Sequence, residues 1–179
     1  MRQALGRLFQ GTASPFPALR RAHEMMSLGE YAQAAMTFEQ LACAAEAPNG
    51  LRAPHLHLQA GRARLLNNQP AAALPHFKRG LELLIENGRY NQVYRAGQRI
   101  VQELKLRGLE REAREIAALV GTSIPAIADM PTERGPDVAA VLLPTHCESC
   151  GGPVRATEVE WLDSRTAECP YCGSPVRAL

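Results

Sequence analysis

Two Cys-x-x-Cys pairs near the end of the chain are the residues best suited to chemistry. Cys147 and Cys150 form the first pair, Cys169 and Cys172 form the second, and 18 residues lie between the pairs. One such turn can place both of its sulfurs on a single ion, and two turns together supply the four thiolates of a tetrahedral site. Because thiolates fill every position of such a site, we expect a structural metal ion rather than a catalytic one.

The residues around the two pairs predict a small β-module. Gly151 and Gly173 directly follow the pairs, where the backbone must curl over the ion and glycine accepts a positive φ. Between the pairs, residues 157–161 alternate polar and apolar, 163–164 offer a turn, and 165–168 lead back to the second pair. This pattern predicts a β-hairpin that brings the two pairs together.

The motifs CxxCGGP and CPYCGSP around a short hairpin resemble the zinc-ribbon family, whose metal-binding turns are shared by rubredoxins. The resemblance covers residues 144–179 and implies one structural Zn²⁺ held by the four cysteines. Iron is the alternative metal, since four thiolates suit both ions. Trp161 and Tyr171 are the only aromatic residues of the module, which gives less cover than iron rubredoxins have and favours zinc. A disulfide framework is disfavoured because no secretory signal is recognisable.

An internal repeat organises the first two thirds of the chain. Turn residues stand at positions 29, 68 and 108, spaced 39 and 40 apart, and each follows a helical stretch, at 17–27, 53–66 and 91–106. Intervals 45–50 and 86–90 hold Pro, Asn and Gly and fit connections between units. After each turn comes a small residue, followed four positions later by an aromatic residue in the first two copies: Ala34 and Phe38, Ala73 and Phe77, Ala113 and Ala117.

The turn-Ala-x₃-Phe pattern resembles tetratricopeptide repeats, which are helix–turn–helix units of about 34 residues. The resemblance implies a right-handed array of about three units. The period here is longer, Pro75 falls inside a second helix, and the third copy lacks the aromatic residue. We therefore expect a mainly α protein in four parts: an N-terminal segment (1–14), the helical repeats (15–120), a Pro-rich linker or strap (121–144) and the zinc ribbon (145–179).

The composition is that of an ordinary soluble globular protein, with 46% hydrophobic and 21% charged residues. No run approaches the roughly 20 apolar residues of a membrane span, and without a recognisable signal we expect a cytoplasmic protein. Residues 1–144 hold 17 Lys and Arg against 13 Asp and Glu, whereas 145–179 hold three against five. An acidic ribbon is poorly suited to phosphate contacts, so nucleic acid is not the expected partner.

The remaining candidates for chemistry are weak. His55 and His57 diverge by about 200° around a helix, so with His76 they are not expected to converge on one ion. Cys43 lies among apolar helical residues and is expected to be a small buried side chain. No Ser/His/Asp set, pair of inward carboxylates or Gly-rich phosphate loop is recognisable, so we expect a protein that is not an enzyme.

The first helix of each unit should line the concave groove of such an array. This groove would grade from apolar to basic, and we expect it to bind a peptide that pairs an apolar anchor with an acidic stretch. The candidate partner-binding residues are Phe16, Leu19, His23 and Met26 in the first unit, Leu58 and Arg62 in the second, and Arg95 and Lys105 in the third. His55, Leu65, Gln98 and Gln102 lie on the same expected face.

These features together favour a non-catalytic adaptor that binds a partner protein or peptide and ends in a structural zinc ribbon. The combination resembles lipopolysaccharide-assembly adaptors, which join tetratricopeptide repeats to a rubredoxin-like module. No segment here resembles the membrane anchor of that family, so its pathway is not carried over. The alternatives are nucleic-acid binding through the ribbon, with the repeats recruiting partners, and electron transfer through an iron centre.

Overall fold

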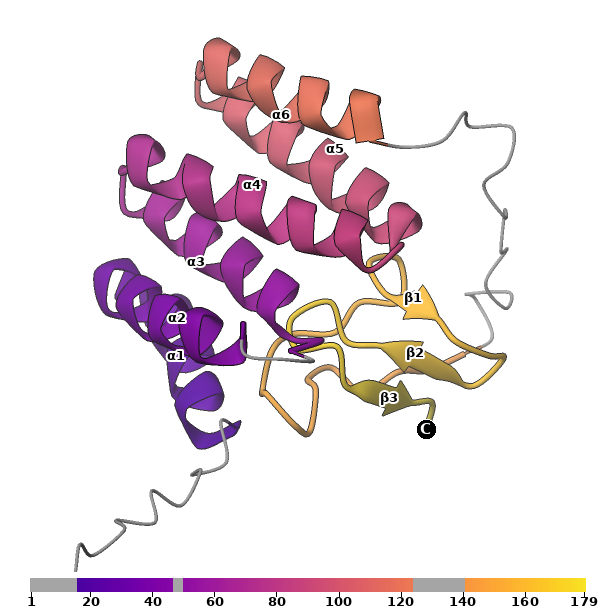
Figure 1. Ribbon diagram of the computed structural model, residues 1–179. Coiled ribbons are helices and arrows are strands. Elements are labelled where there is room, and N and C mark those ends of the chain that lie inside the picture. The colour runs from indigo at the N-terminus through magenta and orange to yellow at the C-terminus, as the bar shows by residue number, and fades with distance from the viewer. Residues whose placement is uncertain (1–15, 47–49, 124–140) are drawn as a thin grey trace, which may run out of the picture.

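The computed structural model describes residues 16–46, 50–123 and 141–179, which form a stack of helices with a small β-module beside it (Figure 1). Three short antiparallel strands follow six helices, so the expectation of a mainly α fold with a small β-module is confirmed. The helices are α1 (Phe16–Leu28), α2 (Tyr31–Ala45), α3 (Ala53–Leu66), α4 (Pro70–Glu86), α5 (Tyr90–Leu106) and α6 (Glu110–Ser123). The strands are β1 (Glu160–Trp161), β2 (Thr166–Glu168) and β3 (Pro175–Arg177).

The three turn residues expected from the repeat all adopt the left-handed backbone conformation. Gly29, Asn68 and Gly108 have φ of 80°, 56° and 74° and join α1 to α2, α3 to α4 and α5 to α6. After each of them, the next backbone N–H donates to a carbonyl five residues back, as from Gln69 to Arg64 at 2.9 Å. This is the Schellman motif, which satisfies the last carbonyls of one helix while the chain reverses into the next.

The repeated small and aromatic positions lie where the helices of each pair cross. Ala34, Ala73 and Ala113 are fully buried, and the rings of Phe38 and Phe77 fill the neighbouring space. The packing around the second ring is so close that a Cβ atom added to Gly61 would lie 2.7 Å from the Cδ1 of Phe77. The expected close crossings are therefore confirmed, whereas Ala117, which replaces the aromatic residue in the third copy, is exposed.

Helices adjacent in the sequence pack against one another along the whole stack, and α4 also contacts α6. One hydrophobic cluster fills the region from the end of α3 to α6. A second cluster joins buried residues of α1, α2 and α3 to the four cysteines of the β-module. No helix within the described ranges is long and apolar enough to cross a membrane.

The β-module, residues 141–179, contains the expected hairpin and one further strand. β1 and β2 pair antiparallel with Trp161 opposite Ala167, and β3 pairs with β2 on its other edge. β1 and β2 are shorter than the stretches 157–161 and 165–168 from which the hairpin was predicted. The sequence did not predict β3. At the turn, the carboxylate of Asp163 accepts hydrogen bonds from the backbone N–H groups of Arg165 and Thr166, both at 2.7 Å.

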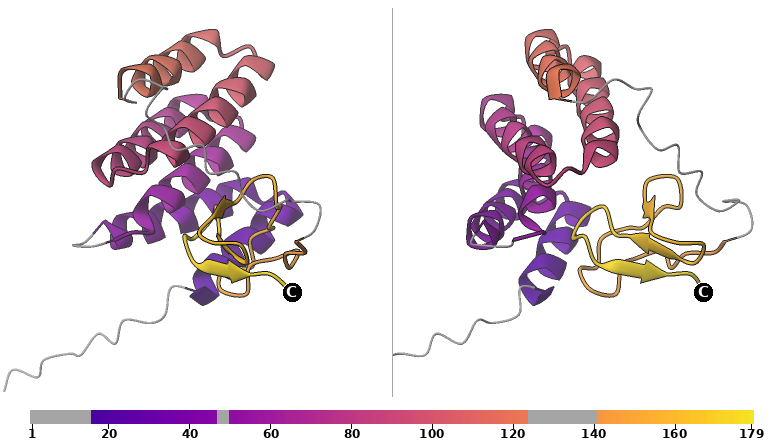
Figure 2. Two further views of the ribbon diagram at one scale, coloured as in Figure 1. Left: turned by 90° about the vertical axis from the view of Figure 1, so that its right-hand side faces the viewer. Right: turned by 45° about the vertical axis from the view of Figure 1, so that its right-hand side comes forward.

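Most of the expected Pro-rich linker or strap (121–144) lies outside the described residues. Within the described part, the carbonyl of Leu142 accepts a hydrogen bond from the N–H of Leu179 at 2.9 Å, and Leu143 packs on the cluster that contains the cysteines. Two views show the β-module against the side of the stack formed by α1, α3 and α5 (Figures 1 and 2). On this side lie the first helices of the three units, which were expected to line the partner-binding groove.

Two histidines form the centre of a hydrogen-bonded chain between α2, α3 and α4. His57 Nε2 lies 2.6 Å from Glu46 Oε1, and His76 Nε2 lies 3.3 Å from Glu39 Oε1. The two Nδ1 atoms face each other at 3.0 Å. If each Nε2–H donates to its carboxylate, the facing Nδ1 atoms are satisfied only when they share one proton.

Arginines at both ends keep the carboxylates of this chain ionised. The hydrogen bond from Arg64 lowers the pKa of Glu39, and the hydrogen bond from Arg79 lowers the pKa of Glu46. Burial lowers the pKa of His76, and the neighbouring carboxylate of Glu39 only partly offsets this effect. His55 and His57 point to different neighbours, His55 to Glu168 and His57 to Glu46.

Acidification should destabilise the fold through His76. Because its pKa is lowered in the folded protein, the unfolded chain takes up a proton more readily, and stability falls as the pH drops below 6.5. In His76→Gln, the free energy of unfolding at pH 7.5 should fall by about 1–3 kcal/mol, and its dependence on pH between 7.5 and 5.5 should become shallower. Urea unfolding at several pH values measures both effects.

His146→Gln is the matched control for this experiment, because His146 is exposed and, within the described part of the chain, its ring hydrogen-bonds only with Thr145. It should keep the pH dependence of the wild type. Equal pH slopes for the wild type and His76→Gln would contradict the assignment of His76 as a titrating group.

Candidate metal centre

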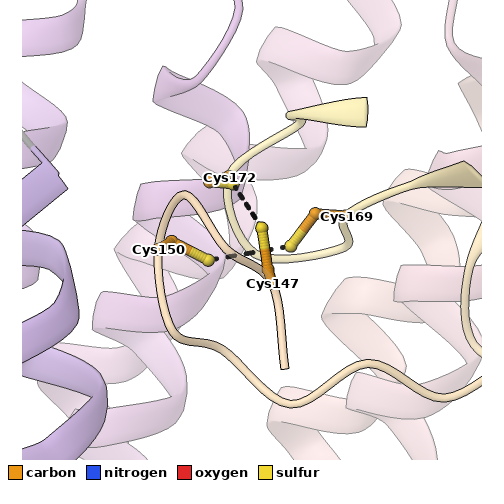
Figure 3. A group of neighbouring side chains, drawn as sticks. All are labelled: Cys147, Cys150, Cys169 and Cys172. Carbon is orange, nitrogen blue, oxygen red and sulfur yellow. Dashed lines mark hydrogen bonds between the residues drawn. The ribbon is translucent and has the colours of Figure 1, made fainter. Parts of the chain in front are cut away.

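The four cysteines converge on one point inside the β-module (Figure 3). The sulfurs of Cys147 and Cys172 lie 3.8 Å apart, those of Cys150 and Cys169 lie 3.7 Å apart, and all four lie within 4.8 Å of one another. A tetrahedron with metal–sulfur bonds of about 2.3 Å has edges of about 3.8 Å, whereas a disulfide needs about 2.05 Å. The cluster therefore has the dimensions of a metal site and could hold a metal ion.

The two Cys-x-x-Cys turns have nearly the same backbone geometry. Gly151 and Gly173 have φ of 73° and 69°, as the sequence predicts for residues that close these turns. Their N–H groups donate to the carbonyls of Cys147 and Cys169 at 2.8 and 2.9 Å. Two residues after the second cysteine of the first pair, the N–H of Gly152 points to the Cys150 sulfur at 3.3 Å. Backbone dipoles thus partly neutralise thiolate charge.

Four thiolates this close would repel one another unless protons or a cation lay between them. Hydrogen bonding with Cys147 raises the pKa of the Cys150 and Cys169 thiols, because a proton held between two sulfurs is lost only with difficulty. All four cysteines are buried, with at most 3% of their surface exposed, so water does not screen their mutual repulsion. A divalent ion would remove this penalty by replacing the protons.

The metal-binding turns are themselves packed against the helices. The ring of Tyr171 meets the ring of His23 edge-on at 5.1 Å, and His23 in turn meets Phe38 at 5.3 Å. Burial lowers the pKa of His23 to about 4, so the ring is neutral in this apolar contact at pH 7. On the other side of the first turn, Arg20 donates to the backbone carbonyls of Glu148 and Ser149.

A buried carboxylate fixes the second turn to α3 and α5. Glu168, which directly precedes the third cysteine, accepts hydrogen bonds from Arg89 and from Gln92 and lies 3.4 Å from the Nε2 of His55. Burial alone would raise the pKa of this carboxyl, but the contacts with His55 and Arg89 outweigh it and lower the pKa to about 2. Nearby, Arg95 donates to the carbonyl of Val159 at 3.0 Å.

The predicted partner-binding residues therefore have different surroundings. In the first unit, Leu19 and His23 are buried, and Met26 is half-buried against the cluster that contains the cysteines. The ring of Phe16 is stacked under the guanidinium of Arg52 at 4.5 Å. The β-module thus occupies the N-terminal part of the expected groove, a role that the sequence had left open for the linker.

The C-terminal part of this face is more accessible. A cleft of about 250 Å³ lies between the β-module and helices α3 and α5, and Leu58 and Arg62 are among the predicted residues that line it. Lys105, Gln98 and Gln102 line a shallower hollow further along α5. Arg95 is exposed but already bound to the β-module, and Leu65 is buried in the second hydrophobic cluster.

The structure corrects one expectation and adds residues that the sequence did not indicate. Cys43 is exposed on α2 rather than buried, because it lies on the face of that helix turned away from α1 and α3. The sequence analysis placed Glu168 in a hairpin strand without a role in docking, and it predicted no role for Arg20 or Arg89. The sequence feature that indicates such contacts is the opposite charge of the two parts, since the helices are basic and the β-module is acidic. The acidic charge argues against nucleic-acid binding, and the opposite charges also favour docking of the β-module on the helices.

No protein-family model matches the chain, and neither a curated protein nor a solved structure matches it. Function is therefore inferred from the geometry of the site.

Replacing one metal-site cysteine should remove the metal ion and loosen the β-module. Cys150→Ser should reduce bound metal from one ion per chain to near zero and lower the melting temperature, because the cysteines belong to the same hydrophobic cluster as α1, α2 and α3. Helical circular dichroism at 25 °C should be largely kept, since a separate cluster holds α3 to α6 together. Elemental analysis and thermal unfolding measure these effects.

Cys43→Ser is the matched control, because it removes a thiol that is exposed on α2. It should keep one metal ion per chain and the melting temperature of the wild type. Retention of stoichiometric metal by Cys150→Ser would contradict the four-cysteine site.

Proposed function

We propose that this protein is a non-catalytic adaptor: tetratricopeptide-like repeats bind a partner protein or peptide, and the β-module is a zinc ribbon that holds one structural Zn²⁺. Three turn-Ala copies with the same Schellman ending support the repeat assignment, as does the burial of the small residue in every copy. The longer period and the exposed Ala117 mark the third unit as a divergent one.

Zinc is proposed because the site is closed and its donors are four buried thiolates. Such sites in small ribbons are typically structural zinc sites, in which the ion holds together a module too small to fold on its hydrophobic core alone. The three strands here contain only two or three residues each. A metal ion that ties the two turns together supplies the stability that so small a sheet lacks.

The identity of the ion is tested by composition and colour. The purified protein should be colourless and contain one zinc ion per chain by elemental analysis, and a strong chelator should release that ion together with a loss of thermal stability. A red protein with stoichiometric iron would instead favour the electron-transfer alternative.

The observation that carries the adaptor proposal is the cleft between the β-module and helices α3 and α5. It has apolar walls, including Leu58 and Ile100, and arginine side chains at its rim. The described residues bring together no nucleophile, base and oxyanion donors that would suggest catalysis in this cleft. A surface built from two modules, with apolar walls and a charged rim, suits a polypeptide partner.

Reversing charge along this face should weaken partner capture. Arg62 and Lys105 are exposed, so the double variant Arg62→Glu/Lys105→Glu should change the melting temperature little. Recovery of the main partner in tagged affinity purification, quantified by mass spectrometry, should fall at least about tenfold, which corresponds to about 1.4 kcal/mol of binding free energy. Arg114→Glu on α6 is the matched control, since Arg114 is also exposed and lies outside the cleft.

Unchanged recovery with the double variant would place binding on another surface. Sub-micromolar binding of DNA or RNA that is steeply salt-dependent, and is lost when Arg155, Arg165 and Arg177 are replaced, would favour the nucleic-acid alternative instead.

A further inference from the structure

Two buried oxygen atoms between α5 and the β-module have no hydrogen-bond partner within residues 16–46, 50–123 and 141–179. They are Oε1 of Gln92 and Oε2 of Glu160. The amide of Gln92 cannot be turned over, because its Nε2 donates to Glu168 Oε1 at 3.3 Å and a carboxylate only accepts. Arg89 lies 3.8 Å from Glu160 Oε2, which is too far for a hydrogen bond. Because buried polar groups are almost always hydrogen-bonded, the two acceptors point to a ligand that carries hydrogen-bond donors.

Gln92 and Glu160 line a small inner pocket of about 40 Å³ between the β-module and helices α3, α4 and α5. Each carboxylate of this pocket already forms an ion pair with an arginine. These pairs are Glu158 with Arg155, and Glu160 and Glu168 with Arg89. A further cation is therefore not needed to balance charge. A neutral group with two N–H donors, such as an amino group on a planar ring, suits the two free acceptors.

The inner pocket adjoins the cleft of about 250 Å³ between the β-module and helices α3 and α5, since Leu58, Ala96 and Pro170 line both. These shared residues are apolar. One helical turn further along α5, Ile100 lines the cleft together with Tyr171 of the β-module. A cavity of about 150 Å³ holds a benzene molecule, so the cleft has room for a planar ring with its substituents.

Two arginines at the rim of the cleft form no ion pair within the described parts of the chain. Arg62 on α3 and Arg99 on α5 are exposed and line the cleft. The acidic residues of the lining are already paired elsewhere, Glu103 with Arg107 at 3.4 Å and Glu158 as above. Two free guanidinium groups match the charge of a phosphate monoester, which is close to −2 at pH 7, and guanidinium groups bind phosphate through charge-assisted hydrogen bonds.

We propose that the inner pocket and the cleft together bind a nucleotide whose base carries an amino group. The amino group donates to Gln92 Oε1 and Glu160 Oε2, the base lies in the apolar part of the cleft, and the phosphate contacts Arg62 and Arg99. The inference does not depend on the adaptor function. Because the partner is proposed to bind in the same cleft, nucleotide and partner should compete.

Nucleoside monophosphates in matched pairs test each contact on the full-length, metal-loaded protein. AMP and CMP carry an amino group on the base, whereas IMP and UMP carry an oxygen at the same position. By isothermal titration calorimetry, AMP or CMP should bind with a dissociation constant on the order of 10–100 μM. The matched IMP or UMP should bind at least about fivefold more weakly, because its oxygen faces two acceptors. The nucleoside without phosphate should bind at least about tenfold more weakly.

Two variants separate the phosphate contact from the base contact. Arg62→Gln/Arg99→Gln should weaken binding of the nucleotide at least about tenfold and leave binding of the nucleoside nearly unchanged. Glu160→Gln should remove most of the preference for the amino base, because the new amide can donate to the oxygen of IMP or UMP. Arg114→Gln on α6 is the matched control and should bind every probe as the wild type does. In the wild type, the nucleotide should also shift the NMR signal of the Gln92 side-chain amide.

Equal affinity within both matched pairs, equal affinity for nucleotide and nucleoside, or NMR shifts that do not include Gln92 would overturn the inference. So would the absence of binding by both AMP and CMP at about 1 mM, in which case water satisfies the two acceptors. If the tagged protein captures its partner but neither nucleotide binds, this inference fails and the adaptor function is unaffected. If a nucleotide binds as expected but no partner is captured, the adaptor function fails and the nucleotide site is supported.

Discussion

Four buried sulfurs within 4.8 Å of one another are the constraint on which the arrangement of this protein depends. They set the path of two turns, and these turns carry the residues that touch the helices. Arg20 on α1, His55 on α3 and Arg89 before α5 all contact the ribbon next to a metal-site cysteine. These contacts gather at the N-terminal parts of the helices, where the helix dipole also favours an acidic neighbour.

Docking of the β-module covers part of the face formed by α1, α3 and α5. Leu19 and His23 are buried there, and the ring of Tyr171 lies against the ring of His23. The uncovered part of this face lies toward α5, in the cleft between the β-module and helices α3 and α5. Under the proposed adaptor function, a partner bound in this cleft would contact the β-module as well as the helices.

Much of the fold and of the metal site could be predicted because both depend on local rules. A left-handed turn residue, a small residue at a helix crossing and a Cys-x-x-Cys-Gly turn each have a sequence signature, and positions 29, 68, 108, 151 and 173 all have positive φ. The charges of the two parts favour docking, but the contacts themselves could not be placed from the sequence, because Arg20 binds backbone carbonyls more than 120 positions away and such contacts leave no sequence pattern. The exposure of Cys43 was not predicted, because its neighbours in the sequence are small and apolar and do not show which face of the helix is buried.

Helix α3 shows why these parts cannot be treated separately. It is buried on nearly all sides, so its polar residues must each find a specific neighbour. His55 faces the ribbon, while His57, two positions later, points to α2 and α4 through Glu46 and His76. Apolar contacts alone would allow α3 to slide or turn between its neighbours, but each of these polar pairs is satisfied in only one orientation. The register that places His55 against Glu168 also places Gln59 on the wall of the cleft between the β-module and helices α3 and α5.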